Sequence, residues 1–415
     1  MSILRKKRKG PKNMKILVIN AGSSSLKYQL FDMADESVLA KGIVDRIGIE
    51  GSLMTHKLPD GREYRVQTPI ENHTDAFSLV RDVLLTGDEA VISDLSEVSA
   101  IGHRVVQGGA LFSESVLVDD DVLAGIESLC PLAPLHNPAH LQGIRASIEV
   151  FGKDVPEVVV FDTAFHATMP PEAYIFPIPY EYYEKYNIRR YGFHGTSHRY
   201  VTARCLELLK KAKDPRGTKI ITCHLGNGSS ISAVKDGKVI DTSMGLTPLD
   251  GFMMGTRSGA LDPSVVTFIA EKENLSPTEM TDMLNKRSGM LGVSGISSDD
   301  RDLVAASEAG NQRAILTHKI LEYQITKFIG GYVAALGGVD AIVFTAGIGE
   351  NQYTHRAAVC RKLRYLGVKI DEGRNMSSRG VEVELSTSDS KVKVFVIPTN
   401  EELVIARDTM KLIMR

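Results

Sequence analysis

Residues 15–32, KILVINAGSSSLKYQLFD, decide the architecture of this 415-residue chain. A β-rich run, a small polar loop and a second apolar run form the pattern of a β-hairpin whose tip consists of glycine and serine. The same order returns about 200 residues later, which is the expected size of a domain. KIITCH at 219–224 precedes GNGSS at 226–230, and ISAVKDGKVIDTS at 231–243 predicts two strands that turn at Asp236-Gly237. The repetition predicts two halves built on one plan.

Helices are predicted between and after these strands. Asn137-Pro138 indicates a helix that runs to Gly152 with Asn137 as its cap, and SPTE at 276–279 is a capping box that opens a helix to about Lys286. Apolar periodicity over 312–336 and 401–414 predicts two further helices. Strands and helices therefore alternate, which is typical of the α/β class.

The composition, 43% hydrophobic and 24% charged, is that of an ordinary globular protein. No run approaches the roughly 18 apolar residues of a membrane helix, and no apolar stretch follows the charged N-terminus. We therefore expect no membrane span and no secretory signal, and a cytoplasmic protein. Cys130, Cys205, Cys223 and Cys360 form no CxxC pair, which argues against a disulfide framework or a zinc site and predicts buried thiols.

The net charge of −2 hides an uneven distribution. Six basic residues and no acid lie in residues 1–13, so the rest of the chain carries a net charge of −8. A mildly acidic body gives little electrostatic reason to bind nucleic acid. We expect residues 1–13 to be a disordered tail, with contact to an anionic surface as the alternative and Met14 as an alternative natural start. Nucleic-acid binding by the tail would be lost on its deletion, without any loss of catalysis.

Three small-residue loops follow β-rich runs: NAGSSS at 20–25, GNGSS at 226–230 and AGIGEN at 346–351. Backbone N–H groups approach phosphate oxygens where no side chain intervenes, and hydroxyls add further donors. Neither a Walker A motif nor GxGxxG accompanies these loops, which argues against a P-loop or a Rossmann site. One such loop alone is an ordinary turn, but three of them favour phosphate binding.

Phosphoryl transfer also needs cations, and two arginines are candidates. Arg104 lies in GHRVVQGG and Arg257 in MGTRSG, and a surface arginine without function is the alternative for each. His194 and His198 in YGFHGTSH have the spacing of a metal pair, but the sequence lacks HExxH and places a glycine between them. We predict that His194 is catalytic and that His198 lies at a helix start or in the core.

Two acidic residues occupy places where ligands bind. Asp162 ends the run PEVVVFD, at the carboxyl end of a predicted strand, where α/β sheets place ligands, or it caps a turn. Glu401 opens the last predicted helix, where it is either a charge favoured by the helix dipole or a magnesium ligand.

Together these motifs resemble the acetate kinase family. The resemblance covers nearly everything from Met14 onward, in order, on INAGSSSLKYQLFD (19–32), GHRVVQGG (102–109), PLAPLHNP (131–138), VFDTAFHATMP (160–170), YGFHGTSH (191–198), HLGNGSS (224–230), MGLTPLDGFMMGTRSG (244–259), TAGIGEN (345–351) and TNEEL (399–403). It implies two duplicated actin-like (ribonuclease H-like) domains, each a mixed sheet flanked by helices, with the active site in the cleft between them. The expected domains are residues 14–163, completed by a C-terminal helix at 402–415, and a nucleotide-binding domain at 164–401.

The resemblance also implies roles for individual residues. The expected magnesium ligands are Asn20 and Glu401, and the expected catalytic residues are Asp162, His194 and Arg257. The expected substrate-binding residues are Arg104 for the carboxylate, Val106, Leu135, Phe193 and Pro248 for the methyl group, and His136. The expected nucleotide-binding residues are Ser23, Ser25, Lys27, His224, Leu225, Gly226, Asn227, Gly228, Asp299, Asp300, Arg301, Gly347, Ile348, Gly349, Glu350 and Asn351. Two positions depart from the family's pattern: Asp300 replaces an aromatic residue, which puts adenine packing in question, and Ala260 replaces a frequent aspartate.

The implied reaction is reversible, direct in-line transfer of the γ-phosphoryl group of ATP to acetate, giving acetyl phosphate and ADP, with Mg²⁺ for which Mn²⁺ can substitute. A carboxylate with a pKa near ~4 is already ionised, so no general base is needed and Asp162 is expected to organise magnesium, water or Arg257. A homodimer is expected, without nucleic-acid or membrane partners. A propionate kinase is the alternative within the class, because one methylene changes binding by only ~1–3 kcal/mol. An actin-like or chaperone-like ATPase switch is the alternative from another class.

Overall fold

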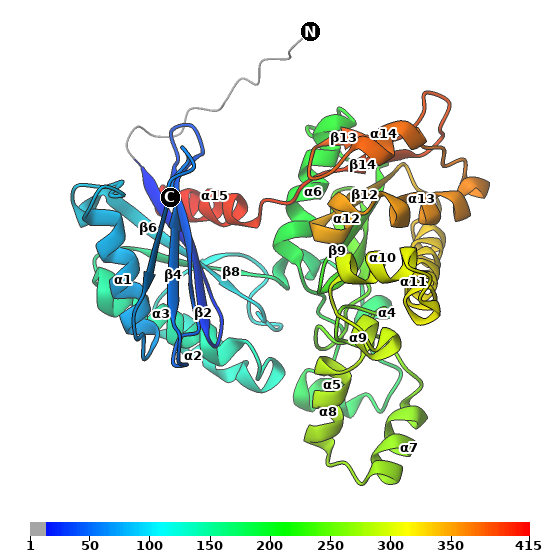
Figure 1. The fold of residues 1–415 in the computed structure, drawn as a ribbon, viewed down its shortest axis with the longest axis horizontal. Coiled ribbons are helices and arrows are strands. Elements are labelled where there is room, and N and C mark those ends of the chain that lie inside the picture. Colours follow the sequence, from blue (N-terminus) through cyan, green and yellow to red (C-terminus); the bar gives the residue numbers. More distant parts are fainter. Residues whose placement is uncertain (1–13) are drawn as a thin grey trace. The chain divides into compact units, whose positions relative to one another are not determined.

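The computed structural model describes residues 14–415, which divide into two compact units (Figure 1). The first unit runs to Ala164 and takes in Asn400–Arg415, and the second is Phe165–Thr399. The tail expected at residues 1–13 lies outside the described residues. Of the helices described, none combines the length and apolar character that crossing a membrane requires.

The first unit contains an eight-stranded mixed sheet in the order β5-β4-β3-β2-β1-β6-β8-β7. Its strands are β1 (Lys15–Ala21), β2 (Ser25–Asp32), β3 (Ser37–Asp45), β4 (Leu53–Lys57), β5 (Glu63–Gln67), β6 (Val98–Val105), β7 (Val116–Leu117) and β8 (Glu157–Phe161). Its helices are α1 (His73–Leu85), α2 (Asp120–Ser128), α3 (Asn137–Phe151) and α15 (Glu401–Ile413). β1, β6 and β8 are parallel, whereas β1 to β5 form antiparallel hairpins.

The second unit contains a six-stranded sheet in the order β11-β10-β9-β12-β14-β13. Its strands are β9 (Lys219–Leu225), β10 (Ser229–Lys235), β11 (Lys238–Thr242), β12 (Ala341–Thr345), β13 (Val383–Glu384) and β14 (Lys393–Val396). Its helices are α4 (Pro171–Tyr174), α5 (Glu181–Tyr186), α6 (Gly195–Leu208), α7 (Pro263–Glu273), α8 (Pro277–Lys286), α9 (Gly289–Ser294), α10 (Asp300–Glu308), α11 (Gln312–Leu336), α12 (Ala346–Asn351), α13 (Tyr353–Lys362) and α14 (Glu372–Ser377).

The two sheets share one connectivity, which confirms the duplicated plan. β3-β2-β1-β6-β8 in the first corresponds to β11-β10-β9-β12-β14 in the second. In each sheet, three consecutive strands form antiparallel hairpins. The first of these strands also pairs in parallel with a later strand, which in turn pairs in parallel with another. Both predicted hairpins are present, although the structure assigns Ser229 and Ser230 to β10 and not to the loop.

One helix of each unit comes from beyond the other unit's strands in sequence. α15 follows β14 in the chain and packs on β1, β6 and β8 of the first sheet. α6 comes after β8 and packs on β9 and β12 of the second sheet. The first sheet is therefore completed by the last helix of the chain, whereas α6 directly precedes the strands that it covers.

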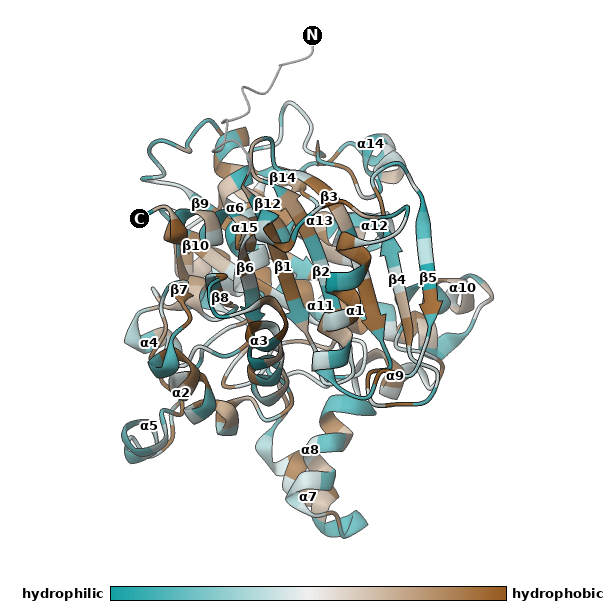
Figure 2. Cartoon of the chain, turned by 90° about the vertical axis from the view of Figure 1, so that its left-hand side faces the viewer, coloured by the Kyte–Doolittle hydropathy of each residue, from teal (hydrophilic) through white to brown (hydrophobic). Residues whose placement is uncertain are grey.

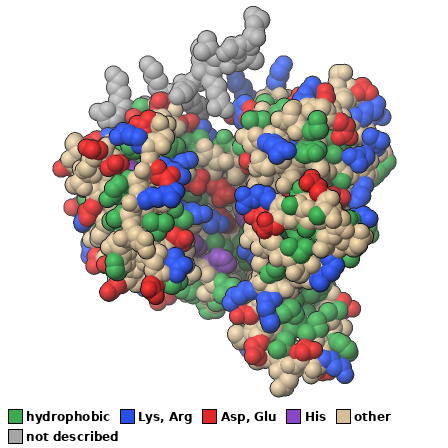
Figure 3. Space-filling model, in the orientation of Figure 1, with side chains coloured by type: hydrophobic (Ala, Val, Ile, Leu, Met, Phe, Trp, Pro, Cys, Tyr) green, Lys and Arg blue, Asp and Glu red, His purple; other side chains and the backbone are tan. Residues whose placement is uncertain are grey.

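Alternation along the strands decides which helix covers which face. Ile221 and Cys223 of β9 belong to the core beneath α11, whereas Ile220 belongs to the core beneath α6. This period of two is the ordinary geometry of a strand. In Figure 2, β1 is hydrophobic, whereas the edge strand β5 is hydrophilic over most of its length. On the face shown in Figure 3, basic and acidic side chains are interspersed.

The predicted helices agree with the structure in position, and the capping box at Ser276 and Glu279 opens α8 as expected. The prediction for Asn137 is wrong, because His136 occupies the N-cap position of α3. The Asn137 amide instead accepts from the backbone N–H of Gln107 at 3.1 Å and donates to its carbonyl at 2.9 Å. Buried backbone groups must find partners, and here that demand outweighs capping.

Two further expectations need correction. The segment 346–351, expected as a loop, is the short helix α12. Three of the four cysteines are buried free thiols, but Cys130 is only partly buried.

The contact between α15 and β6 generates a stability prediction. A Cβ at Gly102 would clash with Thr409 Oγ1 and lie 2.7 Å from Ile405 Cγ2, so α15 lies against the bare backbone of β6. We expect Gly102→Ala to destabilise the protein by about 1–3 kcal/mol, because the helix must move away from the sheet. Chemical denaturation measures the loss. Gly331→Ala is the control, since no atom lies within 4 Å of its Cβ position in α11; equal effects of both substitutions would contradict the prediction.

Candidate active site

Three polar side chains meet where β1, β6 and β8 end. Asn20 lies in β1, Arg104 in β6, and Asp162 directly follows β8. The Asp162 backbone N–H donates to the Val105 carbonyl at 2.9 Å, which continues the pairing of β8 with β6. Because neighbouring parallel strands end at the same edge of a sheet, the side chains at these ends converge.

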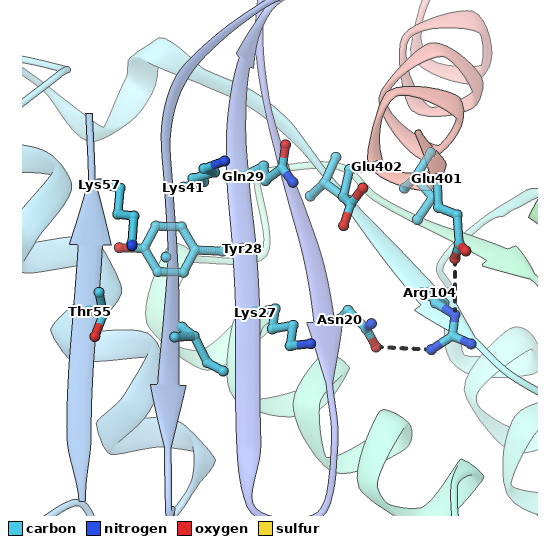
Figure 4. A pocket seen from close by; sticks show the side chains of 14 residues that line it. Asn20, Lys27, Tyr28, Gln29, Lys41, Thr55, Lys57, Arg104, Glu401 and Glu402 are labelled. Carbon is cyan, nitrogen blue, oxygen red and sulfur yellow. Dashed lines mark hydrogen bonds and ion pairs between the residues drawn. The ribbon is translucent and has the colours of Figure 1, made fainter. Parts of the chain in front are cut away.

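Arg104 is held by a buried carboxylate. Its Nη2 lies 2.6 Å from Asp162 Oδ2 and its Nε 3.2 Å from Asp162 Oδ1, which is a two-point contact that fixes the guanidinium plane. Its Nη1 lies 3.4 Å from Asn20 Oδ1, and its Nε lies 4.0 Å from Glu401 Oε2 (Figure 4). Burial lowers the pKa of Arg104, but the charges of Asp162 and Glu401 outweigh burial and raise it. Arg104 is therefore a cation at every working pH.

Glu401 is the first residue of α15 and belongs to the same group. The Asn400 side chain caps the helix by accepting from the Leu403 N–H at 3.0 Å. Burial raises the pKa of Glu401 and Arg104 lowers it, while the charges of Asp162 and Glu402 raise it further, to about 7. The site is thus rich in carboxylates.

A divalent cation fits these residues. The Asn20 carboxamide and the Glu401 carboxylate supply the oxygen donors that Mg²⁺ prefers. Figure 4 shows Asn20 beside Arg104, with the Glu401 carboxylate pointing toward the same guanidinium. A cation here would oppose the burial and the charges of Asp162 and Glu402, which raise the pKa of Glu401.

The first small-residue loop joins β1 to β2. The Gly22 N–H donates to the Ser25 carbonyl at 2.7 Å, and His73 Nε2 lies 2.8 Å from the Gly22 carbonyl. Ser23 is exposed at the tip. Lys27 pairs with Asn20 across the hairpin and lines the same pocket as Arg104 and Glu401.

A second cluster of candidate functional residues, made of histidines and hydroxyl groups, lies in the second unit. His194 precedes α6 in the left-handed conformation, at φ 57°. Its Nδ1 lies 2.8 Å from Ser230 Oγ, and its ring stacks on His224 with centroids 4.1 Å apart. His198 Nε2 lies 2.7 Å from the same Ser230 Oγ. Burial holds the pKa of His198 well below its usual range, which agrees with the core role predicted for it.

Arg257 lies against the loop between β9 and β10. A Cβ at Gly228 would lie 3.3 Å from His194 Nε2 and 3.4 Å from Arg257 Nη1, so both groups approach the same backbone. Arg257 Nη1 donates to the Pro248 carbonyl at 3.2 Å, and burial lowers the pKa of Arg257. Among residues 14–415, no carboxylate forms an ion pair with Arg257. Its charge is the kind that a bound anion compensates.

The predicted nucleotide segments lie around the second sheet. His224 and Leu225 end β9, and Asn227 lies at the exposed tip of the loop that follows. α12 contains the segment 347–351, where Glu350 Oε1 accepts from the Ala346 N–H at 2.8 Å and from the Thr399 N–H at 3.2 Å. Glu350 therefore holds the start of α12.

Residues 299–301 start α10. Asp299 caps the helix by accepting from the Arg301 N–H at 2.9 Å, and the two side chains form an exposed ion pair. The Asp300 side chain instead points into the second unit, toward His318 and His355. Its predicted contact with nucleotide stays a prediction.

The residues predicted to surround a methyl group differ in burial. Val106 and Phe193 are buried, Pro248 is half-buried, and Leu135 is 55% exposed. Their common pocket, and the substrate contact of the half-buried His136, stay predictions.

Sequence reasoning missed His140. It lies in α3, 5% exposed, one helical turn after His136. Burial and the positive charge of Arg104 lower its pKa to about 3. The i,i+4 spacing of the two histidines was the available signal.

Comparisons with known proteins agree on one family. A sequence model of the acetokinase family matches residues 15–407. The acetate kinase of Thermoanaerobacter pseudethanolicus is 56% identical over 401 residues, which cover 96% of this chain and 99% of the relative. The acetate kinase of Thermotoga maritima is 56% identical over 402 residues, with coverages of 96% and 99%.

Solved structures of two kinases match over their whole length. The crystal structure of Porphyromonas gingivalis acetate kinase has a TM-score of 0.92 at 46% identity, and covers 96% of this chain and 100% of that one. The crystal structure of a propionate kinase from Francisella tularensis has a TM-score of 0.89 at 42% identity, with coverages of 96% and 100%.

Buried His140 generates a pH prediction. Its pKa of about 3 lies below the ordinary value of 6.5, so at lower pH the unfolded chain binds a proton that the folded chain does not. The stability contribution of neutral His140 is complete above pH 6.5 and is lost as the pH falls toward 3, by up to about 1.4 kcal/mol per pH unit. We expect His140→Leu to reduce this slope. Urea denaturation at several pH values measures it, and identical slopes in variant and wild type would contradict the prediction.

Proposed function

The chain belongs to the acetokinase family and is a phosphotransferase with a carboxyl group as acceptor, and from this premise we propose how its residues share the reaction. Its activity is phosphoryl transfer between ATP and acetate. The observation that carries the assignment of roles is the convergence of Asn20, Arg104, Asp162 and Glu401 on one sheet edge.

Arg104 binds the acetate carboxylate in this proposal. The guanidinium is fixed by Asp162 on its Nε and Nη2, while the contact given for Nη1 within the described part of the chain is the long one of 3.4 Å to Asn20. A carboxylate is a natural partner for this remaining donor, because arginine and carboxylate match in charge and geometry.

Asp162 acts as a positioning residue and not as a base. Acetate is ionised at neutral pH, so no proton has to be removed from the nucleophile. Both oxygens of Asp162 contact Arg104, which is a role in orientation. Loss of Asp162 would leave Arg104 free to turn away from the substrate.

Asn20 and Glu401 would hold Mg²⁺, and Mn²⁺ offers the same charge and similar ligand preferences. When bound, the ion neutralises charge on the β- and γ-phosphate oxygens. Glu401 offers its carboxylate in the charged form only above its pKa of about 7, unless a cation is present to lower it.

His194 and Arg257 stabilise the phosphoryl group during transfer. The in-line transition state is loose, with charge spread over three equatorial oxygens, and fixed cations and donors lower its energy. The proposal is supported by the approach of both side chains to Gly228 and by the absence of a carboxylate on Arg257 among the described residues. Ser230 orients His194 through Nδ1, which leaves Nε2 toward Gly228.

The loops after β1 and β9 would bind the nucleotide phosphates. Ser23, Ser25 and Lys27 act from the first loop, and His224 to Gly228 from the second. The adenosine would contact residues 299–301 and the start of α12 at Gly347, whose Cβ position has no atom within 4 Å. We place the enzyme in the cytoplasm as a homodimer, and sedimentation equilibrium measures its mass.

A substrate comparison tests the function. We expect acetate to give the highest kcat/KM among acetate, propionate and butyrate, with ATP and Mg²⁺, and hydroxylamine to trap the acyl phosphate. Propionate is the serious competitor, because a propionate kinase matches this chain over its whole length and one methylene is worth only ~1–3 kcal/mol. A preference for propionate would keep the mechanism and change the pocket assignment. ATP turnover without hydroxamate from any carboxylate would overturn the proposal.

The variant Arg257→Ala tests the role proposed for His194 and Arg257 in stabilising the phosphoryl group. We expect kcat to fall by about 10³-fold or more, since a cation that acts on the transferred phosphoryl group is lost, while the Kd for ADP changes little. Steady-state kinetics and calorimetry measure the two quantities. Arg287→Ala is the matched control, because Arg287 is exposed at the end of α8. Near-normal kcat in Arg257→Ala would contradict the assigned role.

A further inference from the structure

Three helices of the second unit bring a carboxylate and two imidazoles together in its interior. Asp300 is the first residue of α10, His318 lies in α11 and His355 in α13. Asp300 Oδ1 lies 3.1 Å from His355 Nε2 and 3.3 Å from His318 Nε2, and one ligand atom from each residue lies within 4.8 Å of the others. These residues are far apart in sequence, so only tertiary packing assembles the group.

The outer ring nitrogens of both histidines have partners of their own. His318 Nδ1 lies 3.2 Å from Ser307 Oγ, and His355 Nδ1 lies 3.0 Å from Glu322 Oε1. Both rings are thereby oriented with Nε2 toward Asp300. Metal-binding histidines are oriented in this manner, by a hydroxyl or carboxylate on the nitrogen that does not bind the metal.

The cluster is incomplete as a set of hydrogen bonds. Asp300 is 5% exposed, and its Oδ2 is buried with no hydrogen-bond partner among residues 14–415. His318 Nε2 also lacks a hydrogen bond that satisfies ordinary geometry, although it lies near Asp300 Oδ1. A buried carboxylate oxygen without a partner is unfavourable and rare. Each of these two atoms therefore lacks the partner that a bound cation would supply.

We propose that Asp300, His318 and His355 bind one divalent transition-metal ion of the zinc type. Two imidazole nitrogens and a carboxylate suit Zn²⁺, which accepts nitrogen and oxygen ligands, whereas Mg²⁺ prefers oxygen alone. The second oxygen of Asp300 or a water completes the coordination. This site is separate from Asn20 and Glu401, which belong to the first unit and offer only oxygen.

The bound ion would tie α10, α11 and α13 together. Its role is structural, because none of the catalytic, acetate-binding or magnesium-binding residues is among its ligands; Asp300 is shared only with the segment 299–301 proposed to contact adenosine. It would also fix the start of α10, where Asp299 and Arg301 flank Asp300. The inference does not depend on the reaction proposed for the chain.

A metal-free ion-pair network is the competing account. Burial lowers the pKa of His355, but hydrogen bonds to Asp300 and Glu322 outweigh burial and raise it to about 9. A protonated His355 would donate to Glu322 and to Oδ1 of Asp300, so it supplies a partner for that oxygen. It leaves Oδ2 without a partner, which the metal would supply.

Metal binding by the full chain tests the proposal. Protein without an affinity tag is stripped with a chelator and titrated with Zn²⁺ in a calorimeter, with excess Mg²⁺ present to occupy oxygen-only sites. We expect one equivalent to bind per chain and the Tm to rise on binding. In place of Zn²⁺, Co²⁺ should give the visible absorption bands of a low-symmetry site with nitrogen ligands. Absence of stoichiometric binding, or of these bands, would overturn the proposal in favour of the ion-pair network.

Variants locate the binding. We expect His318→Gln to abolish the Co²⁺ bands and the stoichiometric uptake, and Ser307→Ala to weaken binding by about tenfold to 100-fold through its effect on the His318 ring. Lys319→Gln is the control, since Lys319 is exposed on the same helix. Unchanged uptake in His318→Gln would overturn the site. Should His318→Gln not fold, the Co²⁺ spectrum of the wild type and the affinity of Ser307→Ala still decide.

Discussion

The ion pair between Arg104 and Asp162 is the constraint on which the first unit depends. A buried carboxylate needs a cation, and removal of one partner of such a pair is strongly destabilising. The pair spans the ends of β6 and β8, so it requires the parallel register of these strands. It also sets where Asn20 and Glu401 lie, because both approach the same guanidinium. The geometry that stabilises the sheet edge is thus the geometry to which our proposal assigns substrate binding.

In the second unit, the basic side chains of the candidate site are held by neutral groups. Its cation Arg257 is anchored by a neutral carbonyl, and neutral hydroxyls orient His194 and His198. The charge of Arg104 is already compensated by the Asp162 carboxylate, whereas Arg257 has no such partner among the described residues. A carboxylate fixed on Arg257 would weaken the attraction of this arginine for phosphate. This difference agrees with the roles proposed for the two arginines: Arg104 orients a carboxylate, and Arg257 stabilises charge on the phosphoryl group.

The sequence predicted what local pattern controls. Both hairpins, the turn at Asp236, the capping box at Ser276 and the long helix 312–336 follow from alternation, turn chemistry and periodicity. The convergence of Asn20, Arg104 and Asp162 could be predicted only in part. The sequence places each residue at the end of a strand, but no single segment determines that β1, β6 and β8 are neighbours.

Tertiary partners explain the failures. Asn137 pairs with Gln107 and does not cap α3, and the Glu350 carboxylate joins the start of α12 to the backbone of Thr399, which is distant in sequence. Asp300 departed from the pattern of the resemblance, but nothing local indicated that it faces His318 and His355. No single-sequence rule joins residues that are far apart in the chain and meet only after folding.

The position of α15 at the end of the chain has a consequence for synthesis on the ribosome. The strands of the first sheet are complete when residue 161 emerges, yet the helix that covers β1, β6 and β8 is the last to be made. Until then one apolar face of that sheet has no cover, and a nascent chain in this condition is prone to aggregate or to recruit a chaperone. The second unit, whose α6 precedes β9, has its covering helix before its first strand. The half that is translated first is therefore the half that finishes folding last.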